Sequence, residues 1–455
     1  MRVLYVSPEA LPFSKTGGLG DVAGALPAAL ARLGLRVTVV TPWYATLSGP
    51  PVRAVGTLAV PGVPEPVRVG QAFVEGVEYV FLGGSAFSRP KLYGYEDDVR
   101  RFAGFCLAVP HAAAMLGIRP DVVHLNDWQS GLLAPILKFG KLPPAVRGAC
   151  TVFSIHNLQY QGRWNPWEVL AWTGLPDVVV QPDGLEFWGD ASCLKAGINY
   201  SERVLTVSPN YAREIQTPAF GFGLDGALRR RGVTGILNGL DVGVWDPRTD
   251  PHIASPFETP AGKEANRVDL RERLGLEGGR PLAVLVTRLA DQKGLDLLLA
   301  ALPKLLEGWN LAVLGSGERL FAGPLQALSG VAPGRVFFHG GFDDELAHRL
   351  YAGGDALLMP SRFEPCGLTQ MIAMRYGTVP VVHLTGGLRD TVGPERGIGF
   401  EAATPEALED ALDEALAAFG TPRWERWQRE GMAADFSWDG PAREHEKLYR
   451  SLAAN

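Results

Sequence analysis

Short apolar runs alternate with helical patterns along most of the chain. Apolar positions spaced as on one face of a helix cover residues 19–33 and 99–116. Residues 50–85 instead alternate short β-like runs with Gly and Pro, which predicts a β-rich excursion. The runs predicted as buried strands in this first half are residues 3–7, 36–41, 121–125, 148–155, 203–207 and 234–237. Strands that alternate with helices predict an α/β fold with a parallel, doubly wound sheet.

The second half repeats this organisation without repeating the sequence. A proline-rich, irregular stretch at residues 247–260 separates the halves, so we predict one domain over residues 1–240 and another over residues 241–435. Two such sheets facing each other would leave a deep cleft between their carboxyl ends. The predicted strands of the second half are residues 281–287, 311–314, 336–339, 356–359 and 379–383.

The last stretch of the chain, residues 436–455, has the pattern of an amphipathic helix. Leu448, Tyr449 and Leu452 share one face of it. We expect this helix to return to the first domain.

Chain length supports two domains, and net charge argues against one class of binding partner. A chain of 455 residues is too long for one ordinary hydrophobic core. The net charge of −6 and the lack of a long basic tract argue against nucleic acid as the ligand. The dense basic cluster at residues 229–231 is either a solvated helix end or a contact to an anionic ligand.

Cysteine usage and hydropathy favour a cytoplasmic protein. The four cysteines show no close spacing, which is typical of reduced thiols. The apolar run at the amino terminus is too short for a signal peptide. No later run approaches the roughly 20 apolar residues that span a bilayer, so we expect no membrane segment.

Polar groups follow several predicted strands directly. Glu364 lies on the strand-to-helix loop of residues 359–370, and the next strand is followed by Thr385, Gly386 and Gly387. Loops at the carboxyl ends of parallel strands are the usual place for a ligand site. The alternative is that Glu364 is a solvated carboxylate and that the glycines only form turns.

A glycine-rich loop joins the first strand to the first helix. Lys15 precedes Gly17 and Gly18, and Asp21 follows them. Strand, glycine loop and helix stand in the order that holds phosphates at a helix amino end. The glycines match neither the dinucleotide nor the P-loop fingerprint, so a plain turn is the alternative to a diphosphate or sugar contact.

Read together, these loops resemble those of the glycosyltransferases that make bacterial glycogen and plant starch. The resemblance spans nearly the whole chain, and its motifs occur in the family's order. They are residues 15–21, 155–157, 238–241, 288–294, 364–370 and 385–388. The resemblance implies the GT-B fold, with the acceptor glucan on the first Rossmann-like domain and the nucleotide sugar on the second. It also implies transfer of glucose from ADP-glucose to the non-reducing end 4-hydroxyl of an α-1,4-glucan, with retention of the α configuration.

The resemblance also implies the site residues. Departure of the diphosphate builds negative charge, which Arg288 and Lys293 are placed to stabilise. A structural ion pair is the alternative role for Arg288. The catalytic candidates are Arg288, Lys293, Glu364, Asp127 and His156. The nucleotide-sugar candidates are Lys15, Gly17, Gly18, Asp21, Asn238, Cys366, Gly367, Leu368, Thr369, Thr385, Gly386 and Gly387.

Aromatic residues are the candidates for the acceptor. Tyr93 and Tyr95, in a glycine-containing loop, and Trp128, beside Asp127, are predicted to contact the glucan. Four tryptophans of the first domain either stack on glucose rings or belong to the core. They are Trp164, Trp167, Trp172 and Trp188.

The carboxylates of the sequence and its lack of metal-binding motifs argue against two classes of mechanism. Asp127 is expected to position the acceptor hydroxyl, with general base as a further possibility. Retaining hydrolases use two carboxylates about 5 to 5.5 Å apart, and no such pair is evident in the sequence. Many retaining GT-B enzymes carry a second glutamate where Ile372 stands here, which favours the glycogen-synthase branch. Neither an Asp-x-Asp sequence nor zinc-ligand spacing is present, so we expect no metal and no cofactor.

Three alternatives remain open at this stage. Nothing in the residues themselves chooses ADP-glucose over UDP-glucose. A GT-B phosphorylase would need a lysine imine to pyridoxal phosphate. A glucan-binding protein without turnover would keep oligosaccharide binding after Lys293→Ala and Glu364→Ala and would release no ADP.

Overall fold

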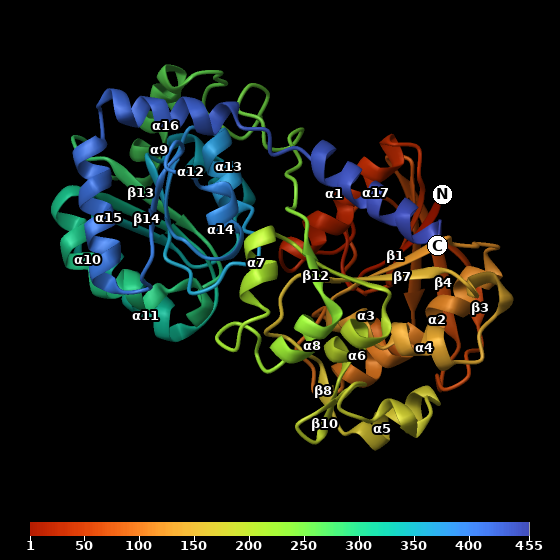
Figure 1. Ribbon diagram of the computed structural model, residues 1–455. Coiled ribbons are helices and arrows are strands. Elements are labelled where there is room, and N and C mark those ends of the chain that lie inside the picture. The colour runs from red at the N-terminus through yellow and green to blue at the C-terminus, as the bar shows by residue number, and fades with distance from the viewer. Residues whose placement is uncertain (455) are drawn as a thin grey trace. The chain divides into compact units, whose positions relative to one another are not determined.

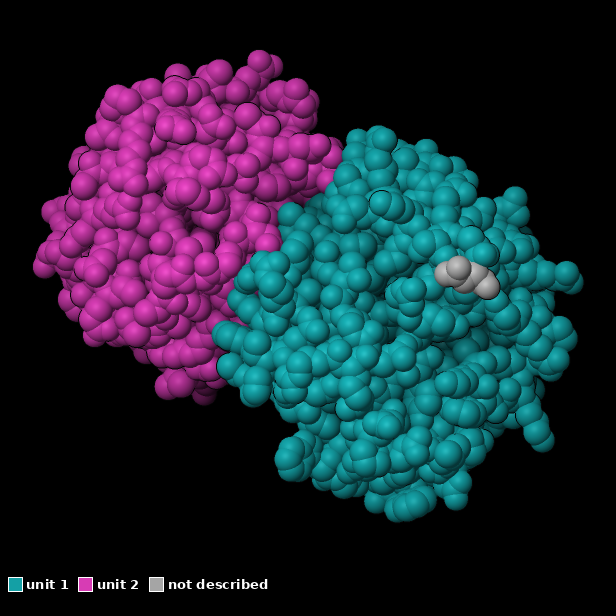
Figure 2. All heavy atoms as spheres, viewed as in Figure 1, with its two compact units in different colours: residues 1–239, 438–455 teal, residues 240–437 magenta. Residues whose placement is uncertain are grey.

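The computed structural model describes residues 1–454. The chain forms two compact units, coloured separately in Figure 2. Unit 1 comprises residues 1–239 and the C-terminal segment from Trp438, and unit 2 comprises Leu240–Ser437. Each unit has its own sheet and its own hydrophobic core. Within residues 1–454, no helix combines the length and the apolar content that crossing a bilayer requires.

Unit 1 is built on a mixed sheet whose strands read β12-β11-β7-β6-β1-β2-β5-β4-β3. The strands from β12 to β5 pair in parallel. The β-rich excursion predicted for residues 50–85 is confirmed, and within it β4 pairs antiparallel with both β3 and β5. The bounds are β1 (Arg2–Val6), β2 (Arg36–Pro42), β3 (Arg53–Leu58), β4 (Val67–Val74), β5 (Val77–Gly83), β6 (Val122–Asn126), β7 (Cys150–Ile155), β11 (Arg203–Thr206) and β12 (Val233–Gly235).

Helices cover this sheet, and the predicted C-terminal helix is one of them. Figure 1 shows α17 (Asp439–Ala453), in blue, beside α1 (Gly18–Arg32), in red. Tyr449 and Leu452 of α17 are buried in the core of unit 1, and Leu448 packs against it. The other helices of unit 1 are α2 (Asp98–Met115), α3 (Asp127–Gly131), α4 (Leu133–Phe139), α5 (Pro166–Thr173), α6 (Cys193–Tyr200), α7 (Pro209–Glu214) and α8 (Asp225–Arg231).

A small antiparallel sheet, which the sequence pattern did not predict, adjoins these helices. It has the order β8-β10-β9. Its strands are β8 (Arg163–Trp164), β9 (Glu186–Phe187) and β10 (Asp190–Ser192), which are too short to give a periodic signal.

Unit 2 is an open sheet of parallel strands in the order β15-β14-β13-β16-β17-β18. The predicted strands are confirmed as β13 (Leu282–Val286), β14 (Asn310–Leu314), β15 (Val336–His339), β16 (Ala356–Met359) and β17 (Val379–His383). The sequence analysis missed β18 (Ile398–Phe400) at the edge of the sheet. Its helices are α9 (Glu264–Leu274), α10 (Leu295–Gly308), α11 (Arg319–Val331), α12 (Asp344–Gly353), α13 (Thr369–Arg375), α14 (Gly386–Thr391), α15 (Pro405–Ala418) and α16 (Pro422–Ala433).

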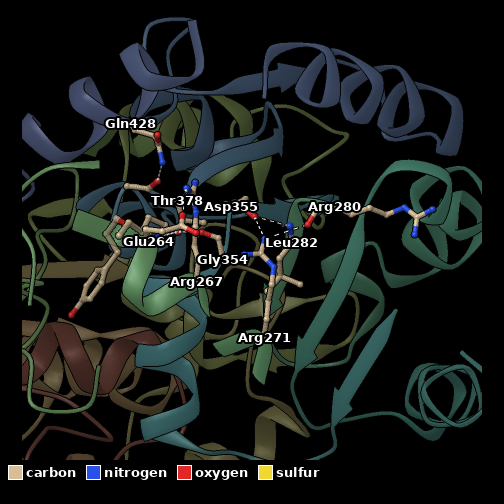
Figure 3. A network of polar contacts seen from close by, with 12 residues as sticks. Glu264, Arg267, Arg271, Arg280, Leu282, Gly354, Asp355, Thr378 and Gln428 are labelled. Carbon is tan, nitrogen blue, oxygen red and sulfur yellow. Dashed lines mark hydrogen bonds and ion pairs between the residues drawn. The ribbon is translucent and has the colours of Figure 1, made fainter. Parts of the chain in front are cut away.

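A buried polar network fixes the amino ends of β13 and β16 (Figure 3). The Asp355 side chain is fully buried and forms ion pairs with Arg267 at 2.7 Å and with Arg271 at 2.9 Å. It also accepts a hydrogen bond from the backbone N–H of Leu282 at 2.8 Å. Because a buried carboxylate is stable only when it is paired and hydrogen-bonded, this network ties α9 to the sheet. The opposite, carboxyl ends of the same strands carry the candidate site.

Candidate active site

The strand order of each sheet reverses at one point, and the predicted loops meet there. In unit 2 the chain leaves β13 and later returns to place β16 on its other side. In unit 1 the corresponding neighbours are β1 and β6. Ligands of doubly wound sheets bind outside the carboxyl ends of the strands at such reversals.

The centre of the unit 2 site is an ion pair between two loops. Lys293 Nζ lies 2.6 Å from Glu364 Oε2, and both side chains are largely buried. The loops can approach this closely because Gly294 lies between them. A Cβ at Gly294 would lie 2.1 Å from the carbonyl oxygen of Pro360, and its φ of 65° is in the left-handed region. Glu364 is therefore a buried, paired carboxylate, and the solvated-loop alternative is wrong.

Two further residues hold Glu364 in place. Ser361 Oγ donates to Glu364 Oε2 at 3.2 Å. His383 Nδ1, at the end of β17, lies 2.7 Å from the carbonyl oxygen of Ser361 and donates to it. Neither residue was predicted from the sequence, although a polar side chain at the end of an apolar strand was the available signal for His383.

Arg288 follows β13 and is exposed. Its guanidinium donates to Gln292 Oε1 at 3.3 Å, and Gln292 Nε2 donates to the Phe363 carbonyl at 3.2 Å. Among the ion pairs of residues 1–454, none includes Arg288. The structure thus gives no support to the alternative of a structural ion pair, and the exposed guanidinium is available to an anion.

The Thr385-Gly386-Gly387 loop packs directly under the Glu364 loop. The backbone N–H of Gly387 donates to the Glu364 carbonyl at 3.0 Å. A Cβ at Gly386 would lie 1.8 Å from that same carbonyl oxygen, and a Cβ at Gly387 would lie 2.2 Å from the Cys366 carbonyl oxygen. These glycines are therefore required for close packing of two loops, beyond forming a turn.

Gln370 holds the segment that contains Cys366, Gly367, Leu368 and Thr369. Its Nε2 donates to the carbonyl oxygens of Cys366 at 3.1 Å and of Gly367 at 2.8 Å. Gly367 has a φ of 73°, and Leu368 and Thr369 are half-buried where α13 begins. Gln370 stood in the recognised motif but was not among the predicted site residues.

Phe342 is a further candidate residue that was not predicted from the sequence. It lies just beyond the carboxyl end of β15 and is 81% exposed. An exposed aromatic ring at this edge of the sheet is suited to stack on a flat ligand group. Its position between two glycines and two aspartates directly after a strand was the available signal.

In unit 1 the glycine-rich loop lies after β1. Lys15 Nζ forms an ion pair with Asp21 Oδ1 at 2.8 Å, with both side chains partly exposed. Gly17 precedes the first residue of α1, Gly18. Asn238 lies at the end of unit 1, where it is buried and its backbone N–H donates to the Val207 carbonyl at 3.3 Å.

Asp127 has the electrostatics of a functional residue. It follows β6 with a φ of 55°, a left-handed conformation that is uncommon for a residue other than glycine. Its Oδ1 accepts the backbone N–H groups of His156 at 2.7 Å and Asn157 at 3.3 Å. Burial raises the pKa of Asp127 to about 7, and the nearby Glu9 carboxylate adds to this shift. The carboxyl group therefore exchanges a proton near neutral pH.

His156 is a neutral imidazole whose orientation is fixed. Burial, together with the nearby His445, lowers its pKa to about 3. Its Nε2 lies 2.9 Å from Asn126 Oδ1, while Asn126 Nδ2 donates to the Val6 carbonyl at 3.0 Å. Because Asn126 Oδ1 accepts, the hydrogen of His156 is on Nε2, and Nδ1 keeps a lone pair for a ligand hydroxyl.

The predicted acceptor residues pack against α2. Trp128 and Tyr93 both contact Phe102, with ring centroids 5.5 and 5.9 Å away. Tyr95 lies under the guanidinium groups of Arg89 and Arg101, each 4.9 Å from its ring. The Asp98 carboxylate accepts the N–H groups of Gly94 at 2.8 Å and of Tyr95 at 3.3 Å, which anchors this loop.

The four tryptophans divide into two kinds. Trp164 and Trp172 pack on each other, with ring centroids 6.1 Å apart. Trp167 is 62% exposed and Trp188 is 80% exposed. Trp188 also has a φ of 53° at the turn between β9 and β10, so a large apolar ring is held in solvent by a strained backbone.

The remaining predictions concern charge and metals. The basic cluster at residues 229–231 ends α8, where Arg229 pairs with Asp225 and Arg230 pairs with Asp183. This pattern is that of a solvated helix end. In the described part of the chain, no group of three or more His, Cys, Asp or Glu side chains is arranged to hold a metal ion.

Two family models match the chain. Residues 2–230 match the starch synthase catalytic domain, and residues 266–429 match the glycosyl transferases of group 1. Three glycogen synthases are similar over nearly the full length. The enzyme of Deinococcus radiodurans is 51% identical over 99% of this chain and 100% of its own. The enzyme of Anaeromyxobacter dehalogenans is 47% identical over 100% of this chain and 100% of its own. The enzyme of Thermus thermophilus is 44% identical over 99% of this chain and 99% of its own.

Solved structures give the fold. The catalytic domain of starch synthase IV from Arabidopsis thaliana, bound to ADP and acarbose, matches with a TM-score of 0.93 and 33% identity. The match covers 100% of this chain and 99% of that domain. A sucrose-phosphate synthase from Thermosynechococcus elongatus, 21% identical with a TM-score of 0.65, shares the fold. The chain therefore belongs to the glycogen and starch synthase family of glycosyltransferases and has the GT-B fold expected from its sequence.

Proposed function

We propose that this glycosyltransferase moves glucose from ADP-glucose to the 4-hydroxyl at the non-reducing end of an α-1,4-glucan and retains the α configuration. The observation that carries the proposal is the Lys293–Glu364 pair, 2.6 Å long, beside the exposed Arg288 at the strand reversal of unit 2. This arrangement combines two cations with a carboxylate that can bind sugar hydroxyls.

The cations act on the leaving group. Negative charge grows on the β-phosphate as the bond to glucose breaks, so a donor aimed there stabilises the transition state more than the ground state. Arg288 offers a planar fork and Lys293 a compact charge. Because Lys293 also pairs with Glu364, the carboxylate accepts hydroxyl groups of glucose without repelling the diphosphate strongly.

Unit 1 supplies the acceptor side. Asp127 accepts a hydrogen bond from the attacking hydroxyl, and Nδ1 of His156 accepts one from a hydroxyl of the donor glucose. Asp127 serves the acceptor and Glu364 the donor glucose, so neither carboxylate forms a glycosyl-enzyme intermediate. The hydroxyl attacks on the face from which the diphosphate departs, and a phosphate oxygen takes its proton.

The choice of donor and acceptor rests on similarity and on Phe342. The similar starch synthase IV domain was solved with ADP and acarbose, which supports an adenine nucleotide and an α-glucan. Phe342, 81% exposed beyond β15, is proposed to stack on the base. The four cysteines are free thiols, which supports a cytoplasmic location.

The test is a comparison of donors. The purified protein is given maltotetraose with ADP-glucose or UDP-glucose, and kcat/KM is measured from nucleoside diphosphate release. We expect ADP-glucose to be preferred, and the proton NMR spectrum of the product to show a new α-1,4 linkage. Equal use of UDP-glucose would overturn the donor assignment, and a β linkage would overturn retention. A pyridoxal absorption band would instead point to a phosphorylase.

A further inference from the structure

Helix α1 starts without a capping side chain of its own. The residue at its N-cap is Gly17, which has no side chain to accept the amide hydrogens of the first turn. The missing acceptor comes from Glu9, in the segment after β1. Glu9 Oε1 accepts the backbone N–H of Gly20, in the first turn of α1, at 3.0 Å.

The other oxygen of Glu9 holds the preceding loop. Oε2 accepts the backbone N–H of Thr16 at 2.6 Å and the Thr16 hydroxyl at 2.7 Å. Glu9 is only 2% exposed, and its carboxylate accepts three hydrogen bonds from this loop. One buried side chain therefore fixes both ends of the segment from Thr16 to Gly20, which contains Gly17 and Gly18.

We propose that Glu9 is a positioning residue for nucleotide-sugar binding. Because Glu9 accepts the Gly20 N–H in place of an N-cap side chain, no side chain at residue 17 stands between the loop amides and the diphosphate. This rests on the proposed function, in which Lys15 and the amides of Gly17 and Gly18 meet the donor. An N-cap side chain at residue 17 would satisfy the helix but would occupy the position of the ligand.

The surroundings of Gly17 support this division of roles. Its φ of −159° is extended backbone that any residue adopts, and a Cβ there would meet no atom within 4 Å. Neither the backbone nor the packing of the described residues requires glycine at this position. A ligand that must approach the backbone does require it.

The test starts with Glu9→Gln. The amide of glutamine has one oxygen and one NH₂ group, so it can accept hydrogen bonds from either Gly20 or Thr16 but not from both. We expect the Kd for ADP, measured by calorimetric titration, and the KM for ADP-glucose each to rise about 10-fold, while kcat falls less. Faster hydrogen exchange at Thr16 or Gly20 would show that the loop itself is released.

Glu202→Gln is the matched control. Glu202 Oε2 accepts both the N–H and, at 2.6 Å, the hydroxyl of Thr151, which is the same clamp at the amino end of β7. We expect this variant to lose thermal stability without a change in KM. If Glu9→Gln and Glu202→Gln lower Tm alike and neither changes the Kd for ADP, Glu9 is merely structural and the inference is wrong.

Gly17→Ser separates capping from binding. A serine would cap α1 locally, so we expect Tm to stay equal or rise while the Kd for ADP rises at least 10-fold. A serine variant that binds ADP as tightly as the unaltered protein would overturn the inference. Failure of the proposed function looks different, because the unaltered protein would then bind no ADP, and both proposals would be rejected together.

Discussion

At the scale of single residues, the candidate site departs from ordinary behaviour in conformation and in charge. Asp127 combines a positive φ with a raised pKa, and Glu364 is a buried carboxylate held by one lysine. Both features cost stability that a surface residue would not lose. Such costs are common where a side chain binds a substrate.

Asp127→Asn tests the first of these residues. We expect kcat/KM to fall about 100-fold or more, as for loss of a group that binds or moves a proton. In the unaltered enzyme the ionised carboxylate accepts the hydroxyl, so kcat/KM should rise with pH through about 7, the pKa of Asp127, and the variant should lose this rise. Rates at pH 5 to 9 with ADP-glucose measure both effects.

The stability of the same variant should change in the opposite direction. The pKa is near 4 in the unfolded chain and about 7 in the folded one, so ionising the folded carboxyl costs stability as pH rises between these values. Asparagine also tolerates a positive φ better than most residues. Asp127→Asn should therefore raise Tm, and more at pH 8 than at pH 4; an equal change at both pH values would contradict the raised pKa.

The Lys293–Glu364 pair is the second test at this scale. Lys293→Ala leaves a buried carboxylate without its partner, which typically costs about 3–5 kcal/mol of unfolding free energy. It also removes a cation from the leaving group, so we expect kcat/KM to fall about 100- to 1000-fold. Calorimetry and steady-state kinetics measure the two effects independently.

A double variant separates the effect on stability from the effect on catalysis. Lys293→Met with Glu364→Gln removes both charges, so stability should recover while activity does not. Recovery of both would mean that the pair is only structural. Arg362→Ala breaks a partly exposed ion pair with Asp296, in the first turn of α10, and a longer one with Asp291, and should change kcat/KM within about fivefold.

At the scale of elements, the candidate residues lie in strand-end loops and in one short hairpin. The β9–β10 turn presents Trp188, 80% exposed, beside the glycine-rich turn of Gly223, whose Cβ position is 3.4 Å from the indole Nε1. Phe222, before that glycine, also has a positive φ, of 47°. Two aromatic residues on strained backbone are better explained by a ligand surface than by packing.

Trp188→Ala tests whether this hairpin binds glucan. We expect the KM for maltoheptaose to rise about 5- to 50-fold, with the KM for ADP-glucose unchanged, because an indole stacked on a sugar contributes about 1–2 kcal/mol. Phe73→Ala is the control, since Phe73 is 69% exposed on β4 of the same unit. An equal effect of both variants, or none of Trp188→Ala, would exclude a glucan contact at the hairpin.

At the scale of the whole molecule, helix α17 packs in unit 1, although unit 2 separates it in sequence from the other elements of that unit. Tyr449 of α17 lies 2.6 Å from Nδ1 of His124 in β6, and Nε2 of His124 lies 2.6 Å from Ser154 Oγ in β7. Burial holds the pKa of His124 well below its usual value, so the ring is neutral and needs both partners. β6 leads directly to Asp127, so α17 supports the strand that positions it.

Tyr449→Phe tests this support. The variant leaves a buried ring nitrogen of His124 without a partner, which costs about 1–3 kcal/mol. We expect a lower Tm and a lower midpoint in urea, with kcat/KM nearly unchanged at 25 °C because the fold remains. An unchanged Tm would show that the hydrogen bond contributes nothing to unit 1.

Sequence pattern was sufficient for most of this architecture. Buried strands of ordinary length gave continuous apolar runs, as in β13 to β17, and the longer helices gave their period directly. The polar groups at strand ends located the candidate site. Short or edge elements such as β8 and β18 gave no periodic signal. Glu9 and Asn126 were missed because each is recognised only by its surroundings, which are a helix start without a cap and a hydrogen bond that sets a tautomer. Phe342 was missed although its place between glycines and aspartates after a strand was a usable signal.

The amino-acid sequence alone was enough to predict where apolar runs become strands, which loops carry polar groups, and which family the motifs resemble. Those properties are local, because they depend on side-chain period and on glycine and proline within a few residues. Three features became visible only in the folded chain: the ion pair of Lys293 with Glu364, the cap that Glu9 provides for α1, and the raised pKa of Asp127. These depend on burial and on groups brought together across the chain, which set the energy of each charge.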